Sequence, residues 1–389
     1  MRFWLAAPIL AGLATFLWGG PKEARTLVIL TGDSRGSLSP CGCSKPMVGG
    51  LSRLASVVRS YDAKGSAVLL ANASLTGGIG RQEELKAQTM AQALKSLGAS
   101  AIHLTEEEAQ APEIRLAFEN TLGSRVLTDE RPEIVVGGVR VAIAPGASLD
   151  NEEAAARAHG QKLVVLLDGG QSEARQIAMD HPSVALVDYR QDGRADWSRV
   201  GSTLLATPGS KLQYVMMIEV VDGGFGEPES VVLDERVKDD SATDRLYRTY
   251  LGRVDHEDLL AQTPRSGRAR FAGSKRCGDC HADAYRIWSQ SRHAGALRTL
   301  EAQGHGRDPE CVSCHVVGLD SVHGFQSERL TPQLAAVGCE SCHGPGLAHA
   351  EAPRRRSLPS VGARACMACH VSDHSPDFNF ATFWPRVKH

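Results

Sequence analysis

The sequence predicts an α/β domain over residues 25–236 and a mainly α-helical domain over residues 272–389, joined by a helical and basic linker over residues 237–271. Two observations underlie this division. In the first half, short apolar runs alternate with helical patterns, which is typical of α/β folds. In the second half, eight of the ten cysteines fall into four Cys-x-x-Cys-His units. A length of 389 residues suits two or three domains.

Five short apolar runs in the first half have the length and composition of buried strands. They are Leu27–Leu30, Ala67–Leu70, Ala101–Leu104, Leu163–Leu167 and Val184–Val187. Between the second and third runs, Arg81–Leu97 has apolar residues at helical spacing and is followed by Gly98, a residue suited to ending a helix. This alternation predicts a domain large enough for a substantial core.

The remaining elements of this domain follow from turn residues. Ile134–Ile143 is expected to form a hairpin that turns at Gly137 and Gly138. Tyr214–Val221 and Ser230–Leu233 are expected to be two closing strands. In the linker, Lys238–Leu260 is charged and favours a helix, and the segment after it is basic and interrupted by glycine and proline.

Composition excludes several classes of protein. With 42% hydrophobic and 23% charged residues, the chain resembles neither a disordered protein nor a multi-span membrane protein. A net charge of −2 gives no electrostatic basis for binding nucleic acid. From Pro264 onward, however, sixteen Lys and Arg oppose eleven Asp and Glu. This local excess would suit an acidic partner, and the carboxylates of a prosthetic group would offset it equally well.

The N-terminus is typical of an export signal, which we assign to residues 1–24. Met1–Arg2 is positively charged, and Phe3–Trp18 is uncharged and mainly apolar. This run is short of the roughly 20 residues that span a bilayer. Because Leu17–Gly20 matches a cleavage site poorly, membrane anchoring through residues 3–20 stays open as the alternative. We expect a periplasmic or otherwise extracytoplasmic protein.

The four cysteine units predict covalently bound haem. In each unit two thiols can add to the vinyl groups of one haem, and the adjacent histidine then reaches the iron. The attachment cysteines are Cys277, Cys280, Cys311, Cys314, Cys339, Cys342, Cys366 and Cys369, and the proximal histidines are His281, His315, His343 and His370. The alternative, zinc, would need two Cys-x-x-Cys pairs for each ion. Four haems in about 120 residues would themselves form the core, which agrees with an aromatic content of only 5%.

Six further histidines could supply the sixth iron ligands: His293, His305, His323, His349, His374 and His389. We expect Ala282–Leu300 to form one helix, which would place His293 about 18 Å along the axis from His281 and beside a neighbouring haem. The turn Gly344-Pro345-Gly346 similarly directs His349 towards another haem. Each of these histidines could instead be an ordinary surface residue.

The second half resembles the tetrahaem cytochrome c-554-like family, which accepts electrons from hydroxylamine oxidation in nitrifying bacteria. The resemblance lies in the spacing of the four units and in three segments: Trp288-Ser-Gln-Ser-Arg-His293, Val337-Gly-Cys339-Glu-Ser-Cys-His-Gly-Pro-Gly-x-x-His349, and Ser375-Pro-Asp-Phe378 with Trp384-Pro-Arg-Val-Lys-His389. It implies that His293, His349 and His389 are distal ligands. That family leaves one haem without a protein sixth ligand, so either His305 or His323 binds the fourth iron or no residue does.

The first half is similar to calcineurin-like metallophosphoesterases, especially 5′-nucleotidases, which implies an α/β sandwich. The motifs that bind two metals in that family are degenerate here. Asp33 remains, but Arg35, Asn72 and Thr105 replace expected ligands, and Leu166-Leu-Asp168 and Val187-Asp-Tyr-Arg190 stand where later ligands should follow strands. We therefore expect the fold without phosphoesterase activity.

Cys41 and Cys43 form a separate Cys-x-Cys unit in this domain. They could be a thiol site for a metal or redox reaction, a strained disulfide or two free thiols.

Taken together, these patterns predict an electron-transfer protein with four haems of the c type and an inactive adapter domain. Its expected partners are a redox donor and acceptor and, as a further option, other cytochromes. The rival hypothesis is a haem enzyme that acts on a small nitrogen or oxygen species at one five-coordinate iron. A ligand from His305 or His323 to the fourth iron would argue against that enzyme.

Overall fold

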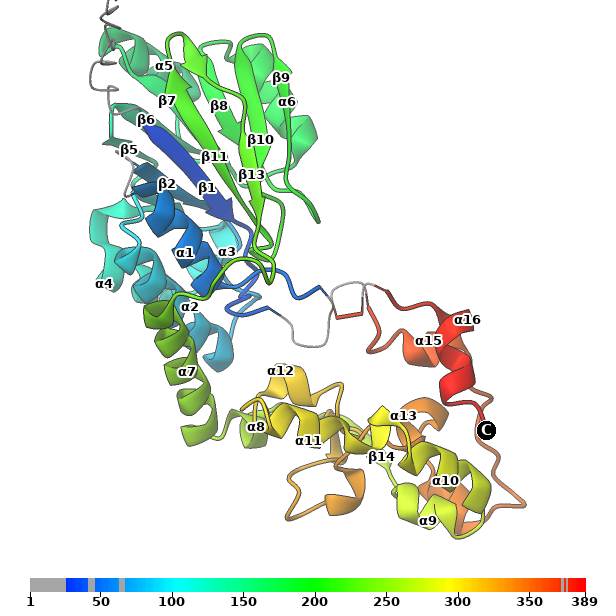
Figure 1. The fold of residues 1–389 in the computed structure, drawn as a ribbon. Helices are drawn as coiled ribbons and strands as arrows, with labels where there is room; N and C mark the ends of the chain where they lie inside the picture. Colours follow the sequence, from blue (N-terminus) through cyan, green and yellow to red (C-terminus); the bar gives the residue numbers. More distant parts are fainter. Residues whose placement is uncertain (1–25, 41–45, 63–66, 372–373, 376) are drawn as a thin grey trace, which may run out of the picture.

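The computed structural model describes residues 26–40, 46–62, 67–371, 374–375 and 377–389. The α/β domain lies at one end, and a long helix connects it to the smaller C-terminal domain (Figure 1). Residues 1–24, predicted as an export signal, and the thiols of Cys41 and Cys43 lie outside the described residues.

The first sheet of the α/β domain has seven strands in the order β12-β11-β1-β2-β3-β4, with β13 also paired to β11. The first four strands in the chain run parallel, and β11 is antiparallel to its neighbours. Their bounds are β1 Leu27–Gly32, β2 Ala67–Asn72, β3 Ala101–His103, β4 Val126–Leu127, β11 Tyr214–Val221, β12 Gly224–Phe225 and β13 Glu229–Val232.

The second sheet has six strands in the order β5-β6-β7-β8-β10-β9. Its inner strands are parallel and its edge strands antiparallel. The bounds are β5 Glu133–Val136, β6 Val139–Ala144, β7 Lys162–Leu167, β8 Val184–Asp188, β9 Asp196–Val200 and β10 Thr203–Thr207. The expected hairpin is confirmed, because β5 and β6 join through Gly137 and Gly138, whose φ angles of 56° and 77° suit a tight turn.

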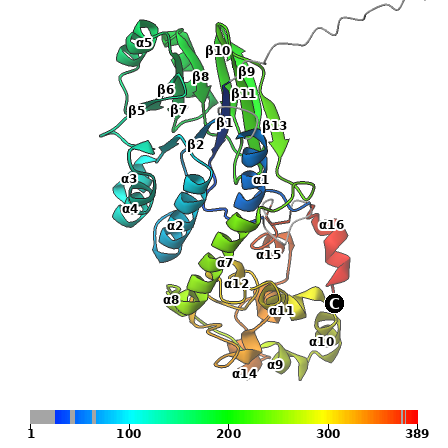
Figure 2. The ribbon, with the colours of Figure 1, turned by 60° about the vertical axis from the view of Figure 1, so that its left-hand side comes forward.

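The two sheets pack face to face between layers of helices (Figures 1 and 2). One apolar cluster fills the space between the sheets, and two others lie between each sheet and its helices. The helices are α1 Leu51–Asp62, α2 Arg81–Ser96, α3 Glu106–Gln110, α4 Pro112–Leu122 and the 3-10 turn η1 Gly123–Arg125 by the first sheet, and α5 Leu149–Ala158 and α6 Gln171–Asp180 by the second. The predicted α/β sandwich is confirmed.

Two helices lead from this domain to the next. Helix α7, Ser241–His256, begins at Asp240, whose side chain accepts a hydrogen bond from Thr243 N, and α8 spans Leu259–Gln262. Tyr250 and Val254 of α7 are buried in the core beneath the first sheet. The first part of the segment expected to be a linker is therefore helical, and α7 packs on the α/β domain.

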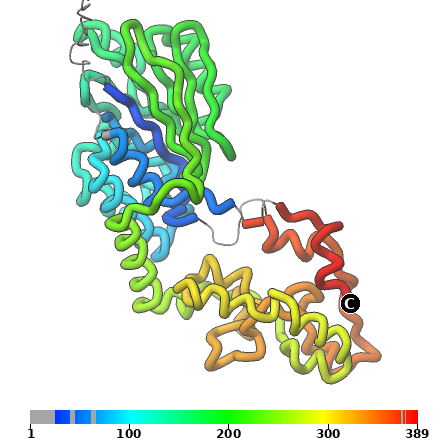
Figure 3. Tube along the Cα trace, viewed as in Figure 1, coloured from blue at the N-terminus to red at the C-terminus, as the bar shows by residue number. Residues whose placement is uncertain are grey.

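The C-terminal domain consists of short helices and turns joined by irregular segments, as the tube in Figure 3 shows. Among its described residues one small apolar core is formed by Leu260, Leu297, Leu300, Val312, Val316, Val317, Leu319, Phe325 and Leu334. Beyond Leu334, the described residues contribute no buried apolar side chain. The elements are β14 Gly267–Arg270, α9 Ser274–Gly278, α10 Ala282–Ser289, η2 Arg292–Gly295, α11 Ala296–Glu301, α12 Pro309–Val312, β15 Ser321–His323, η3 Pro332–Leu334, α13 Cys339–His343, α14 Leu347–Glu351, α15 Ala363–Cys366, α16 Phe380–Phe383 and η4 Trp384–Arg386.

The single helix expected over Ala282–Leu300 was a wrong prediction. Helix α10 stops at Ser289, Ser291 adopts an extended conformation, and the chain restarts as η2 and α11. A tertiary contact stabilises this interruption of the helix, because the indole N–H of Trp288 donates a hydrogen bond to the Val337 carbonyl at 2.9 Å. The axial separation of 18 Å expected between His281 and His293 therefore does not apply.

In the part of the chain that the structure describes, no helix combines the length and the apolar character needed to cross a bilayer.

Candidate haem centres and the strand-end cluster

Each Cys-x-x-Cys-His unit forms a short helical turn. In the first and fourth units, the histidine N–H donates to the carbonyl of the first cysteine, at 2.9 Å in both His281 and His370. The third unit coincides with helix α13. A helical turn places residues three and four apart on one face, so the two thiols and the imidazole can approach the same planar group.

Three of the proximal histidines face a second histidine from elsewhere in the chain. The ring centroids are 6.2 Å apart for His281 and His349, 6.2 Å for His370 and His293, and 5.8 Å for His343 and His389. Metal–imidazole bonds of about 2 Å on both sides would place two ring centroids roughly 6 Å apart. The spacing of all three pairs therefore fits one iron between each pair.

Hydrogen bonds at Nδ1 orient the rings of two proximal and two candidate distal histidines. Nδ1 of His315 lies 2.8 Å from the Ala296 carbonyl, and Nδ1 of His370 lies 2.8 Å from Ser375 Oγ. Nδ1 of His349 similarly meets the Arg356 carbonyl, and that of His389 lies 3.0 Å from the Val387 carbonyl. Ligating histidines commonly use one ring nitrogen in this way, which leaves Nε2 for the metal.

Burial favours the neutral, ligating form of three rings. It lowers the pKa of His293, with a further contribution from His370, and it lowers the pKa of His370 itself. Burial and then the nearby His389 lower the pKa of His343. Neutral imidazole is the form that binds iron.

The other histidines of this half lie in different surroundings. His305 has Nε2 3.4 Å from the Tyr247 hydroxyl, and its Nδ1 is 3.9 Å from both Asp308 and the Cys311 sulfur. His323 is exposed in the short strand β15, and His374 is exposed too. Both ring nitrogens of His305 therefore have partners other than an iron, so the geometry favours neither it nor His323 as fourth distal ligand.

Contacts between the thiols arrange the four units in a series. A hydrogen bond between the thiols of Cys277 and Cys339 raises the pKa of Cys277 and lowers that of Cys339 to about 6. The thiols of Cys314 and Cys369 interact in the same way. Helix α13 of the third unit also packs against α15 of the fourth, so the units follow one another in the order second, fourth, third, first.

The donor set fits haem better than zinc. Among the described residues, the clusters that could bind a metal are His305 with Asp308 and Cys311, and Asp150 with Glu153 and His181. Neither combines two Cys-x-x-Cys pairs, as a structural zinc site would require. The missing apolar core beyond Leu334, together with the three spaced imidazole pairs, suits large planar groups bound between the short helices.

Buried polar contacts fix the second unit to the α/β domain. Lys86 on α2 is 5% exposed and pairs with Glu83 and with Glu310, the residue before Cys311. Burial disfavours the charged ammonium, but Glu310 and Glu83 outweigh this effect and raise the pKa of Lys86. Gln82 donates to Asp308 at 2.8 Å in the same interface.

A second cluster of polar residues lies where strands of both sheets end. Asp33 follows β1, Asn72 ends β2, His103 ends β3, and Asp188 ends β8. Asn72 donates to the carbonyls of Leu167 and Asp188 at 3.2 and 3.0 Å, and its Oδ1 lies 2.8 Å from Nδ1 of His103. Burial lowers the pKa of His103 to about 4 and raises the pKa of Asp188 well above its usual value.

Two guanidinium groups occupy this strand-end cluster. Arg35 binds Asp33 through two hydrogen bonds of 3.0 and 2.9 Å, and Arg190 binds Asp168 at 2.6 Å and approaches Asp33 at 3.6 Å. The hydrogen bond with Asp33 raises the pKa of Arg35. Since both carboxylates are paired with fixed cations, they are poorly available to a divalent metal. Sequence reasoning overlooked His103, although its position at a strand end was a signal, whereas Asp188 lies in a segment that the sequence had already indicated.

Thr105, which replaces an expected metal ligand, has a structural role. It is the N-cap of α3, where it forms a reciprocal capping box with Glu108.

We therefore expect the full chain to hydrolyse neither nucleotides nor nitrophenyl phosphate, even with excess Mn²⁺ or Zn²⁺. The arginines supply the positive charge at the strand ends, and a metal would have to displace them. A steady-state phosphatase assay with and without metal tests this expectation. Metal-dependent turnover that disappears in an Asp33→Ala variant would contradict it.

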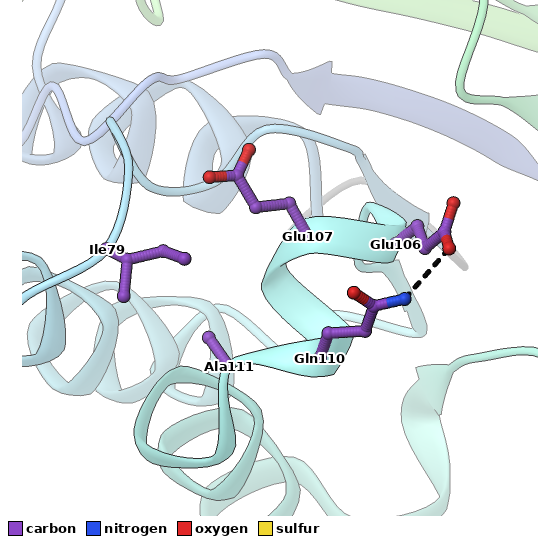
Figure 4. Close-up of a pocket in the computed structure, with 5 residues that line it drawn as sticks. All are labelled: Ile79, Glu106, Glu107, Gln110 and Ala111. Carbon is purple, nitrogen blue, oxygen red and sulfur yellow. Dashed lines mark hydrogen bonds between the residues drawn. The ribbon is translucent and has the colours of Figure 1, made fainter.

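An open hollow of about 490 Å³ lies on the surface beside α3 (Figure 4). It is lined by Ile79, Glu106, Glu107, Gln110 and Ala111, and Gln110 donates to Glu106 at 2.8 Å. None of these side chains belongs to the haem centres or to the strand-end cluster.

Comparisons with known proteins agree with the C-terminal geometry. The family model described as cytochrome c554 and c-prime matches residues 276–344. Cytochrome c-554 of Nitrosomonas europaea is 37% identical over 93 residues, which cover 20% of this chain and 40% of that protein. The chain thus matches less than half the length of this curated relative. Residues 276–344, which include the first three Cys-x-x-Cys-His units, are thus of the cytochrome c554 type, as their motifs indicated, and this family implies covalent haem c and a location outside the cytoplasm.

Two solved structures similar to this chain come from one organism. Sulfate thiohydrolase SoxB of Thermus thermophilus, in complex with glycerol, has a TM-score of 0.49 and 14% identity, with 62% of each chain covered. A 5′-nucleotidase precursor from the same organism has a TM-score of 0.49 and 16% identity, covering 70% of this chain and 68% of its own.

Proposed function

We propose that this protein is a periplasmic multihaem cytochrome that relays electrons through four covalently bound haems. The observation that carries the proposal is the presence of three imidazole pairs, each 5.8 to 6.2 Å apart and each containing the histidine of a Cys-x-x-Cys-His unit. Haem c would supply a one-electron iron couple at each unit, with its potential set by axial ligands and surroundings.

The protein's own residues explain how such groups would be held close together. Eight cysteines would provide covalent attachment, and the contacts between units form a series from the second unit to the first. His349, His293 and His389 would complete the coordination opposite His281, His370 and His343. A relay needs closely spaced centres, and the short helices of this domain leave little protein between its units.

The α/β domain would act as an inactive adapter that docks the relay to a redox donor or acceptor. Two features support this role. The paired arginines of the strand-end cluster disfavour metal-dependent chemistry there. The buried Lys86–Glu310 contact also holds this domain against the second unit, which stands at one end of the series.

The purified holoprotein is expected to carry four haems. Each unit has the complete set of two thiols and one histidine, so each should be loaded during maturation. Intact mass spectrometry would count the haems, and haem staining of a denaturing gel would show that they are covalent. Fewer than four haems by mass, in a preparation matured by a competent host, would contradict the proposal.

The haem-enzyme alternative is favoured by one observation, the engagement of His305 with Tyr247 and Asp308. An electron paramagnetic resonance spectrum of the oxidised protein separates the two functions. Four low-spin centres would support a pure relay, whereas a high-spin centre whose signal changes on addition of cyanide would support the enzyme.

A further inference from the structure

Glu340 is a buried carboxylate inside the third unit, between Cys339 and Cys342. It is only 4% exposed, although an isolated glutamate in such surroundings is costly. Its two oxygens accept three backbone hydrogen bonds, from Ala272 N at 2.8 Å, Gly273 N at 2.8 Å and Gly346 N at 2.7 Å. Hydrogen bonds to an ionised acceptor are stronger than neutral ones, so this carboxylate is firmly held.

These three donors belong to two different segments of the domain. Gly273 lies just before the first unit, and its carbonyl accepts hydrogen bonds from the backbone N–H and the thiol of Cys277. Next to it, Ser274 Oγ accepts a hydrogen bond from Cys339 N at 3.1 Å. Through Gly273, Glu340 therefore fixes the first unit against the third.

Gly346 connects the same carboxylate to a candidate distal ligand. It is the residue before α14, Leu347–Glu351, and this helix carries His349. A Cβ atom at position 346 would lie 3.0 Å from Glu340 Oε1, so the backbone approaches the carboxylate closely. Because His349 faces His281 of the first unit, Glu340 contacts the segments that carry both partners of this pair.

We infer that Glu340 is a positioning residue that holds His349 opposite His281, and that its buried negative charge favours the oxidised iron of the first and third units. The inference rests on the proposed function, since it concerns how the relay's centres are tuned. Axial ligation and nearby buried charge are two of the means by which a protein sets a haem potential.

The test compares Glu340→Gln with Asp279→Asn in the full holoprotein. Asp279 also lies between the two cysteines of a unit, but it is exposed, so its replacement removes the same charge without breaking a buried contact. In Glu340→Gln one oxygen becomes an amide NH₂, which accepts no hydrogen bond, so the variant loses either the contact with Gly273 or the contacts with Ala272 and Gly346.

Spectroelectrochemical titration and electron paramagnetic resonance supply the readouts. In Glu340→Gln we expect at least one midpoint potential to rise. The expected change of about tenfold in the Fe(III)/Fe(II) ratio at fixed potential corresponds to a shift of about 59 mV for one electron. We also expect a high-spin fraction from weakened His349 ligation. Asp279→Asn should retain the wild-type midpoints and spin state. Midpoints and spin states in Glu340→Gln equal to those of Asp279→Asn would overturn the inference.

Glu340→Asp covers the case in which the glutamine variant yields no holoprotein. The aspartate keeps the charge but is one methylene shorter, so it should lose one of the three contacts and raise the high-spin fraction. A wild-type spectrum in this variant would overturn the positioning role. If the wild-type protein carries four haems, failure of this inference would leave the proposed function intact. A wild-type protein without covalent haem would instead refute the proposed function.

Discussion

Replacing Cys339 and Cys342 with alanine is expected to remove one haem and to destabilise the whole C-terminal domain. The third unit lies inside the series of units, since Cys339 contacts Cys277 of the first unit and α13 packs against α15 of the fourth. Loss of its prosthetic group should therefore disturb neighbours on both sides. A terminal unit, such as the second, would have only one neighbour to lose.

The expected size of this effect follows from the core of the domain. Past Leu334 the described residues bury no apolar side chain, so in the proposed holoprotein the macrocycles would provide the apolar contacts there. Removing a buried Phe or Trp side chain costs about 3–5 kcal/mol, and a macrocycle is larger. For a domain of roughly 100 residues, a loss of this size lowers the unfolding temperature by at least about 10 °C.

Intact mass and thermal unfolding followed by haem absorbance measure the two effects. Ser341→Ala is the matched control, because Ser341 lies between the same cysteines and is exposed. We expect this control to keep four haems and the wild-type unfolding temperature. A double-cysteine variant that loses one haem without any loss of stability would show that the protein, not the macrocycle, supplies the core.

The α/β domain was largely predictable because its signals are local. The apolar run at Leu27–Leu30 became β1, the helix expected from Arg81 became α2, and the glycine pair at Gly137 and Gly138 formed its turn. In each case the hydrophobic period or a backbone requirement was sufficient. The strand-end cluster was only partly predicted, because sequence alone did not show that Arg35 and Arg190 would pair with the remaining acids.

The C-terminal domain was less predictable because its elements are set by distant contacts. Helical spacing continues through Ser291 in the sequence, yet helix α10 ends at Ser289. The Trp288 indole there donates a hydrogen bond to the carbonyl of Val337, nearly fifty residues away. Glu340 likewise received no role of its own from the sequence. Its three backbone partners come from segments that only the fold brings together. The cysteine units themselves were evident, because covalent haem attachment dictates their spacing.

Replacing His389 with alanine is expected to convert one low-spin haem to high spin and to raise its reduction potential. His389 is the partner of His343, with ring centroids 5.8 Å apart, and its Nδ1 lies 3.0 Å from the Val387 carbonyl. That hydrogen bond leaves Nε2 to act as the ligand. Loss of a strong-field axial nitrogen weakens the field at the iron, and the oxidised state loses more stabilisation than the reduced state.

Aromatic contacts explain why this ligand should be held firmly enough to matter. Phe378 stacks on His370 with centroids 4.6 Å apart, Phe383 packs edge-on against Phe378 at 5.3 Å, and Arg386 lies 4.7 Å above the Phe383 ring. These contacts anchor the segment that leads to His389 against the fourth unit. The variant should therefore lose one ligand locally, while the other three centres keep their spectra and midpoints nearly unchanged.

His374→Ala is the appropriate comparison, because His374 is an exposed histidine on the same segment. Electron paramagnetic resonance at low temperature would count low-spin and high-spin centres in both variants, and potentiometry would report their midpoints. We expect one new high-spin centre in His389→Ala and none in His374→Ala. The reverse result, an unchanged His389→Ala protein with a new high-spin centre in His374→Ala, would assign the sixth ligand to His374. It would also mean that the spacing of the His343–His389 pair arises from packing rather than from a shared iron.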